Sequence, residues 1–131
     1  MNTDPQSNQK LEGTKLSGFT PQPTVTELQI VDTVVGDGEE VQPNATITAH
    51  YTGALVSDGT IFQSSRDFGR PATFGLNQVI AGWTQGVPGM KVGGTRRLLI
   101  PAAQAYGSQS PSPNIPPNSD LVFDIELISI G

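Results

Sequence analysis

The amino-acid sequence predicts an α+β domain in which one short helix packs on an antiparallel sheet of about five strands. From residue 27 onward, apolar and polar residues alternate with a period of two, which is the pattern of strands that bury one face. Only one segment has helical spacing, and strands do not alternate with helices as they do in parallel sheets. The 15 glycines and 11 prolines among 131 residues indicate frequent turns rather than disorder.

Strand patterning is found in six segments, at residues 27–35, 44–52, 60–63, 71–75, 91–100 and 121–130. In the second segment, one face is shared by Ala45, Ile47, Ala49 and Tyr51. The dipeptide Asp58-Gly59, which is typical of tight hairpins, separates this segment from the third. We therefore expect these two strands to pair with each other.

The helical segment lies between the fourth and fifth strand segments. Asn77 is a residue type that caps helix N-termini, and Pro88-Gly89 ends the pattern. Between these limits, a single apolar stripe is formed by Val79, Ile80, Trp83 and Val87. Residues 108–117 contain four prolines and are predicted to form an irregular loop.

The chain is predicted to contain one domain, at residues 25–131, preceded by a flexible tail or linker at residues 1–24. This first segment is polar, carries Pro5, Pro21 and Pro23, and has no periodic apolar pattern. The sequence gives no indication of oligomerisation, so we expect a monomer. Neither a signal peptide nor a membrane span is recognisable. The compartment stays open: cytoplasmic by default, or extracytoplasmic or membrane-tethered if an N-terminal anchor has been removed.

Composition excludes several classes of function. The formal net charge of −5 and an isoelectric point near 4.5 disfavour binding to nucleic acid or to an anionic membrane surface. The chain has no cysteine, which excludes disulfides, thiolate nucleophiles and iron–sulfur clusters. A single histidine, His50, cannot build a histidine-rich metal site. We expect neither a metal nor a cofactor.

The sequence contains none of the common nucleophile or phosphate-binding motifs. His50 lies on the strand face opposite Ile47 and Tyr51, so we interpret it as a surface residue rather than a catalytic base. Arg96 and Arg97 alternate faces within a strand and are expected to cover surface.

Most aromatic residues lie beside glycines or at the ends of predicted elements. They include Tyr51, Phe62, Phe74, Trp83, Tyr106 and Phe123. One interpretation is a plain hydrophobic core. The other is an apolar pocket with Trp83 as its floor and hydroxyl groups at its rim. Tyrosine suits such a rim because its ring packs while its hydroxyl points at a ligand.

Nine short motifs decide between these interpretations by resemblance. They are Tyr51-Thr-Gly53, Asp58-Gly-x-x-Phe62, Ser64-Ser-Arg66, Val79-Ile-x-Gly-Trp83, Gly86-Val, Met90-Lys-Val-Gly93, Ala105-Tyr-Gly107, Ile115-Pro-Pro117 and Leu121-Val-Phe-Asp124. In this order they resemble the FKBP-type peptidyl-prolyl cis-trans isomerases, and the resemblance covers about residues 28–130. It implies a five- to six-stranded antiparallel half-barrel wrapped around one short helix.

The resemblance also implies an activity, the interconversion of cis and trans X-Pro peptide bonds without a cofactor or a covalent intermediate. The residues that it implies for catalysis are Tyr51, Gln63, Ile80 and Tyr106. Those that it implies for substrate binding are Phe62, Ala72, Phe74, Val79, Trp83, Ile115 and Phe123. Trp83 would underlie the proline ring, while the Ile80 N–H and the Tyr106 hydroxyl would hold substrate carbonyls. The implied partners are proline-containing polypeptides and macrolides such as tacrolimus and rapamycin.

Some positions depart from the family pattern. Gln63 stands where the family usually has an aspartate, and Ala72 where it has a second pocket phenylalanine. Phe68 is the candidate to replace that ring, with an exposed loop aromatic as the alternative. Pro111 occupies a loop position that often holds histidine. Two other functions therefore stay open: a proline-peptide-binding module with weak catalysis, and a chaperone-like module that holds unfolded chains.

Overall fold

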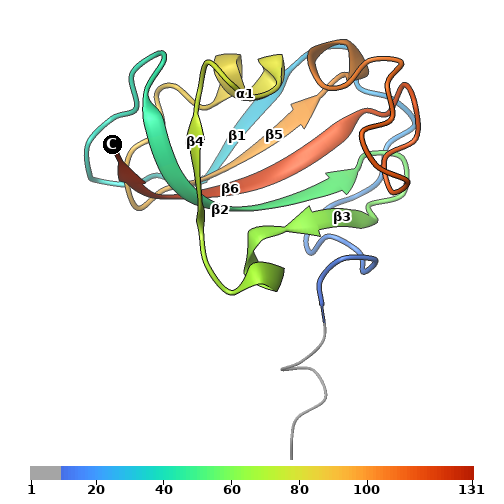
Figure 1. Ribbon diagram of the computed structural model, residues 1–131, viewed down its shortest axis with the longest axis horizontal. Helices are drawn as coiled ribbons and strands as arrows, with labels where there is room; N and C mark the ends of the chain where they lie inside the picture. Colours follow the sequence, from blue (N-terminus) through green and yellow to red (C-terminus); the bar gives the residue numbers. More distant parts are fainter. Residues whose placement is uncertain (1–9) are drawn as a thin grey trace, which may run out of the picture.

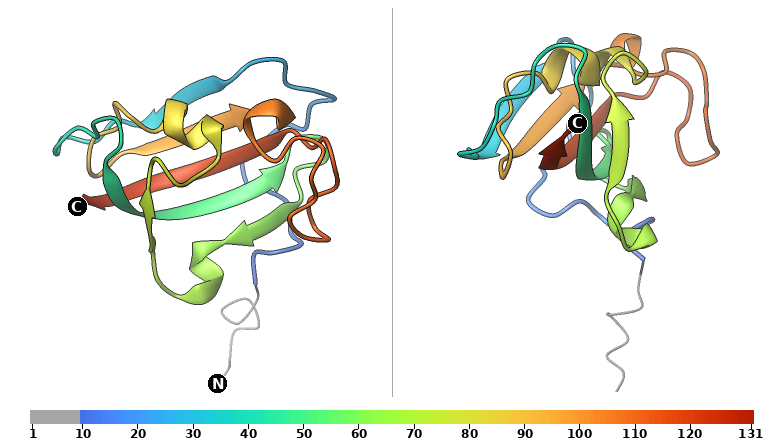
Figure 2. Two further views of the ribbon diagram at one scale, coloured as in Figure 1. Left: turned by 45° about the horizontal axis from the view of Figure 1, so that its top comes forward. Right: turned by 60° about the vertical axis from the view of Figure 1, so that its left-hand side comes forward.

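The computed structural model describes residues 10–131 as an open, curved antiparallel sheet with one short α-helix on its concave side (Figure 1). The strands are β1 (Gln29–Val34), β2 (Thr46–Leu55), β3 (Ile61–Ser64), β4 (Ala72–Gly75), β5 (Thr95–Ile100) and β6 (Leu121–Ile130), and the helix is α1 (Ala81–Gly86). Two short 3-10 helices, η2 (Ser65–Phe68) and η3 (Ala102–Gln104), lie in the connections. The predicted α+β class, with an antiparallel sheet curved around one short helix, is confirmed (Figure 2).

The sheet has the strand order β1-β5-β6-β2-β3, and β4 also pairs with β2. β4 pairs with residues 46–49 of β2, whereas β3 pairs with residues 52–54. β3 and β4 thus follow one another along the same edge of β2. The chain between them, which contains η2, leaves the sheet edge unpaired beside His50 and Tyr51, and we call this the break in the sheet edge.

The concave side of the sheet and α1 enclose the main hydrophobic core. Its most deeply buried side chains, none more than 1% exposed, include Ile47, Leu76, Leu98, Ile100, Leu121, Ile125 and Leu127. α1 approaches β5 closely because its two glycines face the strand. A Cβ atom at Gly82 would lie 2.5 Å from the Ile100 side chain, and one at Gly86 would lie 2.8 Å from Leu98. This close approach presses Trp83 of α1 against the sheet.

α1 begins later than the sequence pattern predicts. Asn77 does not cap it, because the Gln78 N–H donates to the Gly75 carbonyl at 2.9 Å and closes a turn there. The first α-helical bond runs from the Thr84 N–H to the Ile80 carbonyl at 3.2 Å. Ile80 is therefore the N-cap residue, and no side chain caps the helix. The Ile80 N–H precedes the helical bonds and is not used by them.

The sequence pattern places Arg96 on the surface, and this is wrong, because the residue is only 8% exposed. Its guanidinium donates to the Asp32 carboxylate at 2.6 and 3.1 Å, and to the carbonyls of Gly86 and Pro88 at 2.8 and 3.2 Å. Those carbonyls lie at the C-terminal end of α1, where a cation is stabilised by the helix dipole. Arg96 thus joins β1, β5 and α1.

Residues 11–25, which we call the N-terminal strap, pack along the convex side of the sheet, whereas their composition predicts a flexible tail. The Gly13 N–H donates to the Ile61 carbonyl and the Leu16 N–H to the Gly59 carbonyl, each at 2.8 Å. Leu16 and Val25 are buried in a second cluster, whose other members are Ala54, Val56, Ile61, Leu99 and Val122. Residues 1–9 of the predicted tail lie outside the described residues.

Arg97 also holds the strap in place. Its guanidinium donates to the Asp124 carboxylate at 2.6 and 2.8 Å, and to the carbonyls of Gly18 and Ser17 at 2.8 and 3.0 Å. It lies 5.7 Å from the centre of the Phe19 ring. The strap needs no periodic pattern of its own because the sheet already presents an apolar face to it. Within residues 10–131, no helix is long and apolar enough to cross a membrane.

Candidate active site

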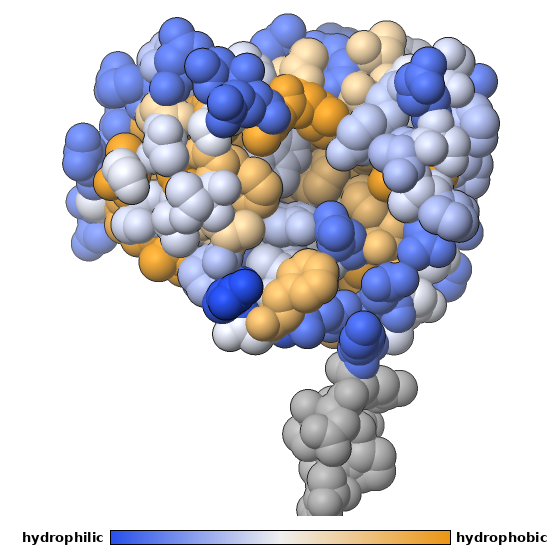
Figure 3. Space-filling model, viewed as in Figure 1, coloured by the Kyte–Doolittle hydropathy of each residue, from blue (hydrophilic) through white to orange (hydrophobic). Residues whose placement is uncertain are grey.

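A cavity of about 420 Å³ opens on the concave side of the sheet, next to α1. This volume is in the range of small-molecule and peptide side-chain sites. On the face shown in Figure 3, apolar residues gather in a hollow that polar residues surround. The residues that line this aromatic cavity are Tyr51, Phe62, Gln63, Phe74, Gln78, Val79, Ile80, Trp83, Tyr106 and Phe123.

The indole of Trp83 lies among the aromatic rings that line the cavity. Its ring centroid lies 4.9 Å from that of Phe74, 5.3 Å from that of Phe123 and 5.9 Å from that of Tyr51, each in an edge-to-face arrangement. Such contacts fix the orientation of each ring as well as burying it. Trp83 is 4% exposed, yet it still lines the cavity.

Phe62 and Phe123 form one side of the cavity because Gly53 has no side chain. Their ring centroids are 5.6 Å apart in an edge-to-face pair. A Cβ atom at Gly53 would lie 2.5 Å from the Phe62 ring and 2.6 Å from the Phe123 ring, which is closer than packing permits. The glycine of Tyr51-Thr-Gly53 thus lets both rings lie directly over β2.

The Tyr51 ring enters the cavity from the break in the sheet edge, where two buried serines hold its backbone. The Tyr51 N–H donates to the Ser65 hydroxyl at 2.8 Å, and the Ser64 hydroxyl donates to the Tyr51 carbonyl at 3.2 Å. Both serines are 1% exposed. Burial, with a smaller contribution from Tyr106, raises the pKa of the Tyr51 hydroxyl above its ordinary value, so the group is a neutral donor at physiological pH.

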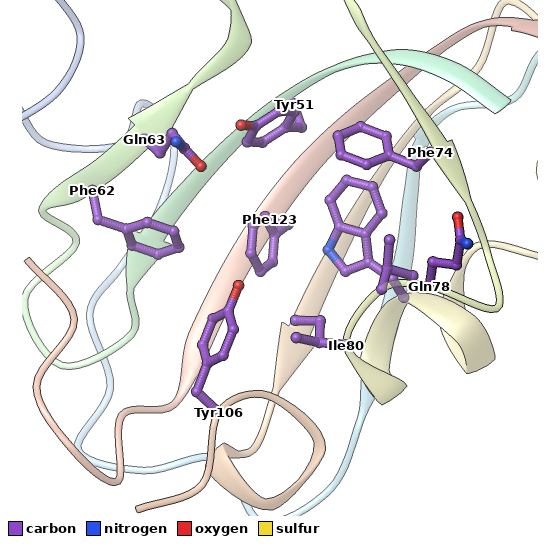
Figure 4. A pocket seen from close by; sticks show the side chains of 10 residues that line it. Tyr51, Phe62, Gln63, Phe74, Gln78, Ile80, Tyr106 and Phe123 are labelled. Atoms are coloured by element: carbon purple, nitrogen blue, oxygen red, sulfur yellow. The ribbon is translucent and has the colours of Figure 1, made fainter. Parts of the chain in front are cut away.

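Tyr106 faces Tyr51 across the cavity mouth. It follows η3 and is 36% exposed, and its hydroxyl points toward the cavity (Figure 4). Of the described residues that line the cavity, none is a carboxylate, a lysine, an arginine or a histidine. The site therefore offers apolar surface and hydrogen-bond donors, and it offers no group suited to nucleophilic attack or to proton transfer at neutral pH.

The structure brings together most of the residues that the sequence singles out. Tyr51, Gln63, Ile80 and Tyr106 line the aromatic cavity, as do the substrate-binding candidates Phe62, Phe74, Val79, Trp83 and Phe123. Ala72 and Ile115 do not line it. Ala72 pairs with Ala49 at the edge of the sheet, and its methyl group is too short to reach the cavity. Ile115 is 5% exposed and belongs to the main core.

Gln78, which the sequence patterns do not single out, lies at the cavity rim on the opposite side from Gln63 (Figure 4). The sequence signal for this residue is its position directly before Val79 and Ile80, two residues already expected in the cavity. Phe68 does not replace the ring missing at Ala72, because it is 63% exposed and is not among the lining residues. That wall of the cavity is therefore low.

His50 lies on the other face of β2, away from the aromatic cavity. It lines a more polar cavity of about 400 Å³ beneath the N-terminal strap, together with residues such as Arg66 and Glu126. Its Nδ1 atom is 2.9 Å from the Ser65 hydroxyl. Among the described residues, no three acidic or histidine side chains are placed to hold a metal ion.

An open antiparallel sheet curved around a short helix, with a tryptophan of that helix as the floor of an aromatic cavity, defines a class of prolyl isomerases. The family model for the FKBP-type peptidyl-prolyl cis-trans isomerase matches residues 37–128. The chain belongs to this family, and it is an enzyme of the peptidyl-prolyl cis-trans isomerase class.

Curated relatives agree with this assignment. The chain is 46% identical over 93 residues to a peptidyl-prolyl cis-trans isomerase of Saccharomyces cerevisiae, a match that covers 70% of this chain and 69% of the relative. It is 44% identical to a probable FK506-binding protein of Corynebacterium glutamicum, with 82% of this chain and 90% of the relative covered. A probable FKBP-type isomerase, FkpA, of Neisseria meningitidis is also 44% identical, but the match spans only 39% of that longer protein.

Solved structures have the same fold. The crystal structure of AtFKBP13 superimposes with a TM-score of 0.70 at 42% identity, and the match covers 79% of this chain and 93% of that one. The crystal structure of FkpA from Escherichia coli gives a TM-score of 0.72 at 40% identity, covering 88% of this chain and 53% of the other.

Proposed function

We propose that the aromatic cavity binds the proline of an X-Pro segment in a polypeptide and accelerates its cis-trans interconversion without forming a covalent bond. The observation that carries this proposal is the uncharged lining around Trp83 in a cavity large enough for a proline ring and its flanking amides. We also propose that the chain acts as a monomer, because its sequence gives no indication of oligomerisation.

The proposed chemistry follows from the nature of the amide bond. Resonance gives the C–N bond partial double-bond character, and the barrier to rotation is about 18–20 kcal/mol. A site that stabilises the twisted amide relative to the planar one lowers this barrier. An apolar cavity does so by removing water that stabilises the polar planar form, and by holding the proline ring while the preceding carbonyl rotates. A gain of about 7 kcal/mol would accelerate the reaction roughly 10⁵-fold.

We propose roles for individual lining residues from their positions in the cavity. Trp83 would lie beneath the proline ring, and the aromatic rings around it would exclude water. The Ile80 N–H, which the helix does not use, and the Tyr106 hydroxyl at the rim would donate to substrate carbonyls. Gln63 would contribute an amide where a carboxylate is usual in the family. Tyr51 would supply a neutral hydroxyl, because its raised pKa keeps it protonated.

Macrolides of the tacrolimus and rapamycin type are proposed as competing ligands of the same cavity. One of the relatives carries the name FK506-binding protein. We expect the small side chain at Ala72, where the family has a phenylalanine, to reduce the apolar contact available to such a ligand.

The proposal is tested by measuring isomerisation of an X-Pro peptide with and without a competing macrolide. Catalysis above the spontaneous rate, inhibited by the macrolide, supports both the activity and its location. An isomerisation rate equal to the spontaneous rate would contradict the proposal.

The uncharged rim at Gln63 favours a second candidate, a module that holds proline-containing segments with little catalysis. A binding titration with the same X-Pro peptide, followed by the fluorescence of Trp83, separates the two functions. Tight binding without faster isomerisation would show that the chain is a binding module. Binding together with faster isomerisation would show that it is an enzyme.

A further inference from the structure

The free edge of β1 carries a group of exposed aliphatic side chains. Ile30, Val31, Val34 and Val35 are 47%, 48%, 53% and 75% exposed. β1 pairs with β5 on one side, and its other side is an outer edge of the sheet (Figure 2). The backbone N–H and C=O groups on such an edge can pair with another extended chain. Among residues 10–131, no strand pairs with this edge, which thus combines free backbone groups with apolar surface.

Acidic side chains lie at both ends of this edge. Glu27 precedes β1, and Asp37, Glu39 and Glu40 follow it, all of them exposed. Lys91 lies opposite Glu40 in an isolated bridge. Arg96 and Arg97 of β5 lie opposite the middle of β1, and they are engaged by Asp32 and Asp124 respectively. The acidic groups therefore outnumber the cations, and the edge has a negative field at each end.

This distribution of charge disfavours a second copy of the chain as the occupant. In an antiparallel pair of β1 strands centred on Asp32, whose own charge is paired with Arg96, the acidic ends of the two copies would overlap. Glu27 of each copy would then come near Asp37 of the other. Like charges directly across two strands are destabilising. The same charges attract a segment whose aliphatic residues are flanked by lysine or arginine.

We propose that the β1 edge, defined here as residues 30–35, binds an extended polypeptide segment with aliphatic residues at its centre and basic residues at its ends, as an added strand. Backbone hydrogen bonds provide affinity in this mode of recognition, and side chains on alternate positions provide specificity. β5 and β6 separate β1 from β2, which carries Tyr51 of the aromatic cavity. The inference is therefore independent of the function proposed for that cavity.

The test uses a fluorescently labelled peptide of alternating valine and threonine with two lysines at each end. It contains no proline, so the aromatic cavity is not its target. Anisotropy titration with the full chain should show saturable binding that weakens as the salt concentration rises. A peptide with the same centre and two glutamates at each end should bind about tenfold more weakly or not at all.

Three variants locate the binding. Replacing Val31 and Val34 together by threonine removes apolar surface but keeps β-propensity, and it should weaken binding several-fold. Replacing Glu39 and Glu40 by glutamine should weaken binding and flatten its salt dependence. Ile128→Thr is the matched control, because Ile128 is also exposed (42%) but lies on β6, and binding should be unchanged.

Four results would overturn the proposal. These are no saturable binding, equal affinity for the lysine and glutamate peptides, unchanged affinity in the Val31/Val34 variant, and an equal loss in Ile128→Thr. Sedimentation velocity adds a further check. Concentration-dependent association that the Val31/Val34 variant abolishes would assign the edge to a second copy of the chain instead.

Discussion

Ser65 fixes the backbone of Tyr51 at the entrance of the aromatic cavity. The Tyr51 N–H donates to the Ser65 hydroxyl at 2.8 Å, and the same hydroxyl lies 3.3 Å from the Tyr51 carbonyl oxygen. Ser65 begins η2, whereas Tyr51 lies in the stretch of β2 that neither β3 nor β4 covers. The serine hydroxyl thus takes the place of the backbone partner that an edge strand would supply at Tyr51.

Ser65→Ala should therefore destabilise the protein and lower its isomerase activity. The substitution leaves the Tyr51 N–H without its partner in a largely buried position, at a cost of about 1–3 kcal/mol. Urea unfolding measures the change in the free energy of unfolding. Ser57→Ala, at an exposed serine, is the control and should be neutral. Equal stability of the two variants would show that the Ser65 hydroxyl does not hold Tyr51.

Tyr106→Phe isolates the contribution of a rim hydroxyl. Because Tyr106 is 36% exposed, we expect the fold and its stability to be nearly unchanged. If the hydroxyl donates to a substrate carbonyl, losing it should reduce kcat/KM by roughly tenfold, the equivalent of about one hydrogen bond. Trp83→Ala should reduce activity further, but it also leaves a large cavity in the core. A Tyr106→Phe variant with wild-type kcat/KM would remove the hydroxyl from the mechanism.

Gln63→Asp tests whether the carboxylate that the family usually has at this position contributes to turnover. Gln63 is exposed at the cavity rim, so the substitution should not disturb packing. A carboxylate there would polarise the uncharged lining, and we expect turnover of an X-Pro peptide to increase. Gln78→Glu places a charge on the opposite side of the rim and serves as the comparison. Unchanged or lower turnover in Gln63→Asp would count against a polarising role for this position.

The strands and the aromatic cavity were predictable because their signals are local. Period-two alternation specifies which face of β2 is buried, and Tyr51 duly packs against the main core. The glycine of Tyr51-Thr-Gly53 indicates a close approach of other groups, which the rings of Phe62 and Phe123 make. The resemblance to a known family then implied the other lining residues except Gln78.

The features that sequence analysis missed depend on distant parts of the chain. Arg96 is buried because its guanidinium donates to Asp32 and to a carbonyl at the end of α1. The alternation of residues within β5 does not indicate either partner. Gln78 reaches the cavity because a turn displaces the start of α1. The strap is ordered because Leu16 meets an apolar sheet face that other segments create.

Leu16→Ala should reveal how much the N-terminal strap contributes to stability. Leu16 is 8% exposed and packs against Ile61 and other residues of the second cluster. Truncating a buried leucine costs about 2–5 kcal/mol, and the lower end is expected here because the strap can partly collapse onto the gap. Thr20→Ala changes an exposed residue of the same strap and is the control. Urea unfolding in which both variants match the wild type would mean that the strap is not held by this cluster.

The ionisation of Tyr51 should be displaced to high pH. Burial raises its pKa above the ordinary value of 10.0, and Tyr106 adds to this shift. Between pH 10.0 and the raised pKa, the folded protein keeps a proton that the unfolded chain has lost. The associated stability is fully present below that range and decreases as the pH rises through it. The absorbance of tyrosinate, recorded as a function of pH, measures the ionisation directly.

Single-tyrosine variants assign the titration, because the chain has only two tyrosines. Tyr51→Phe should remove the component that ionises at high pH. Tyr106→Phe should shift the Tyr51 midpoint downward but leave it above 10.0, because burial is the larger cause of the shift. A Tyr51 midpoint at the value of a free tyrosine in the folded Tyr106→Phe variant would mean that the ring is solvated rather than packed against Trp83 and Phe74.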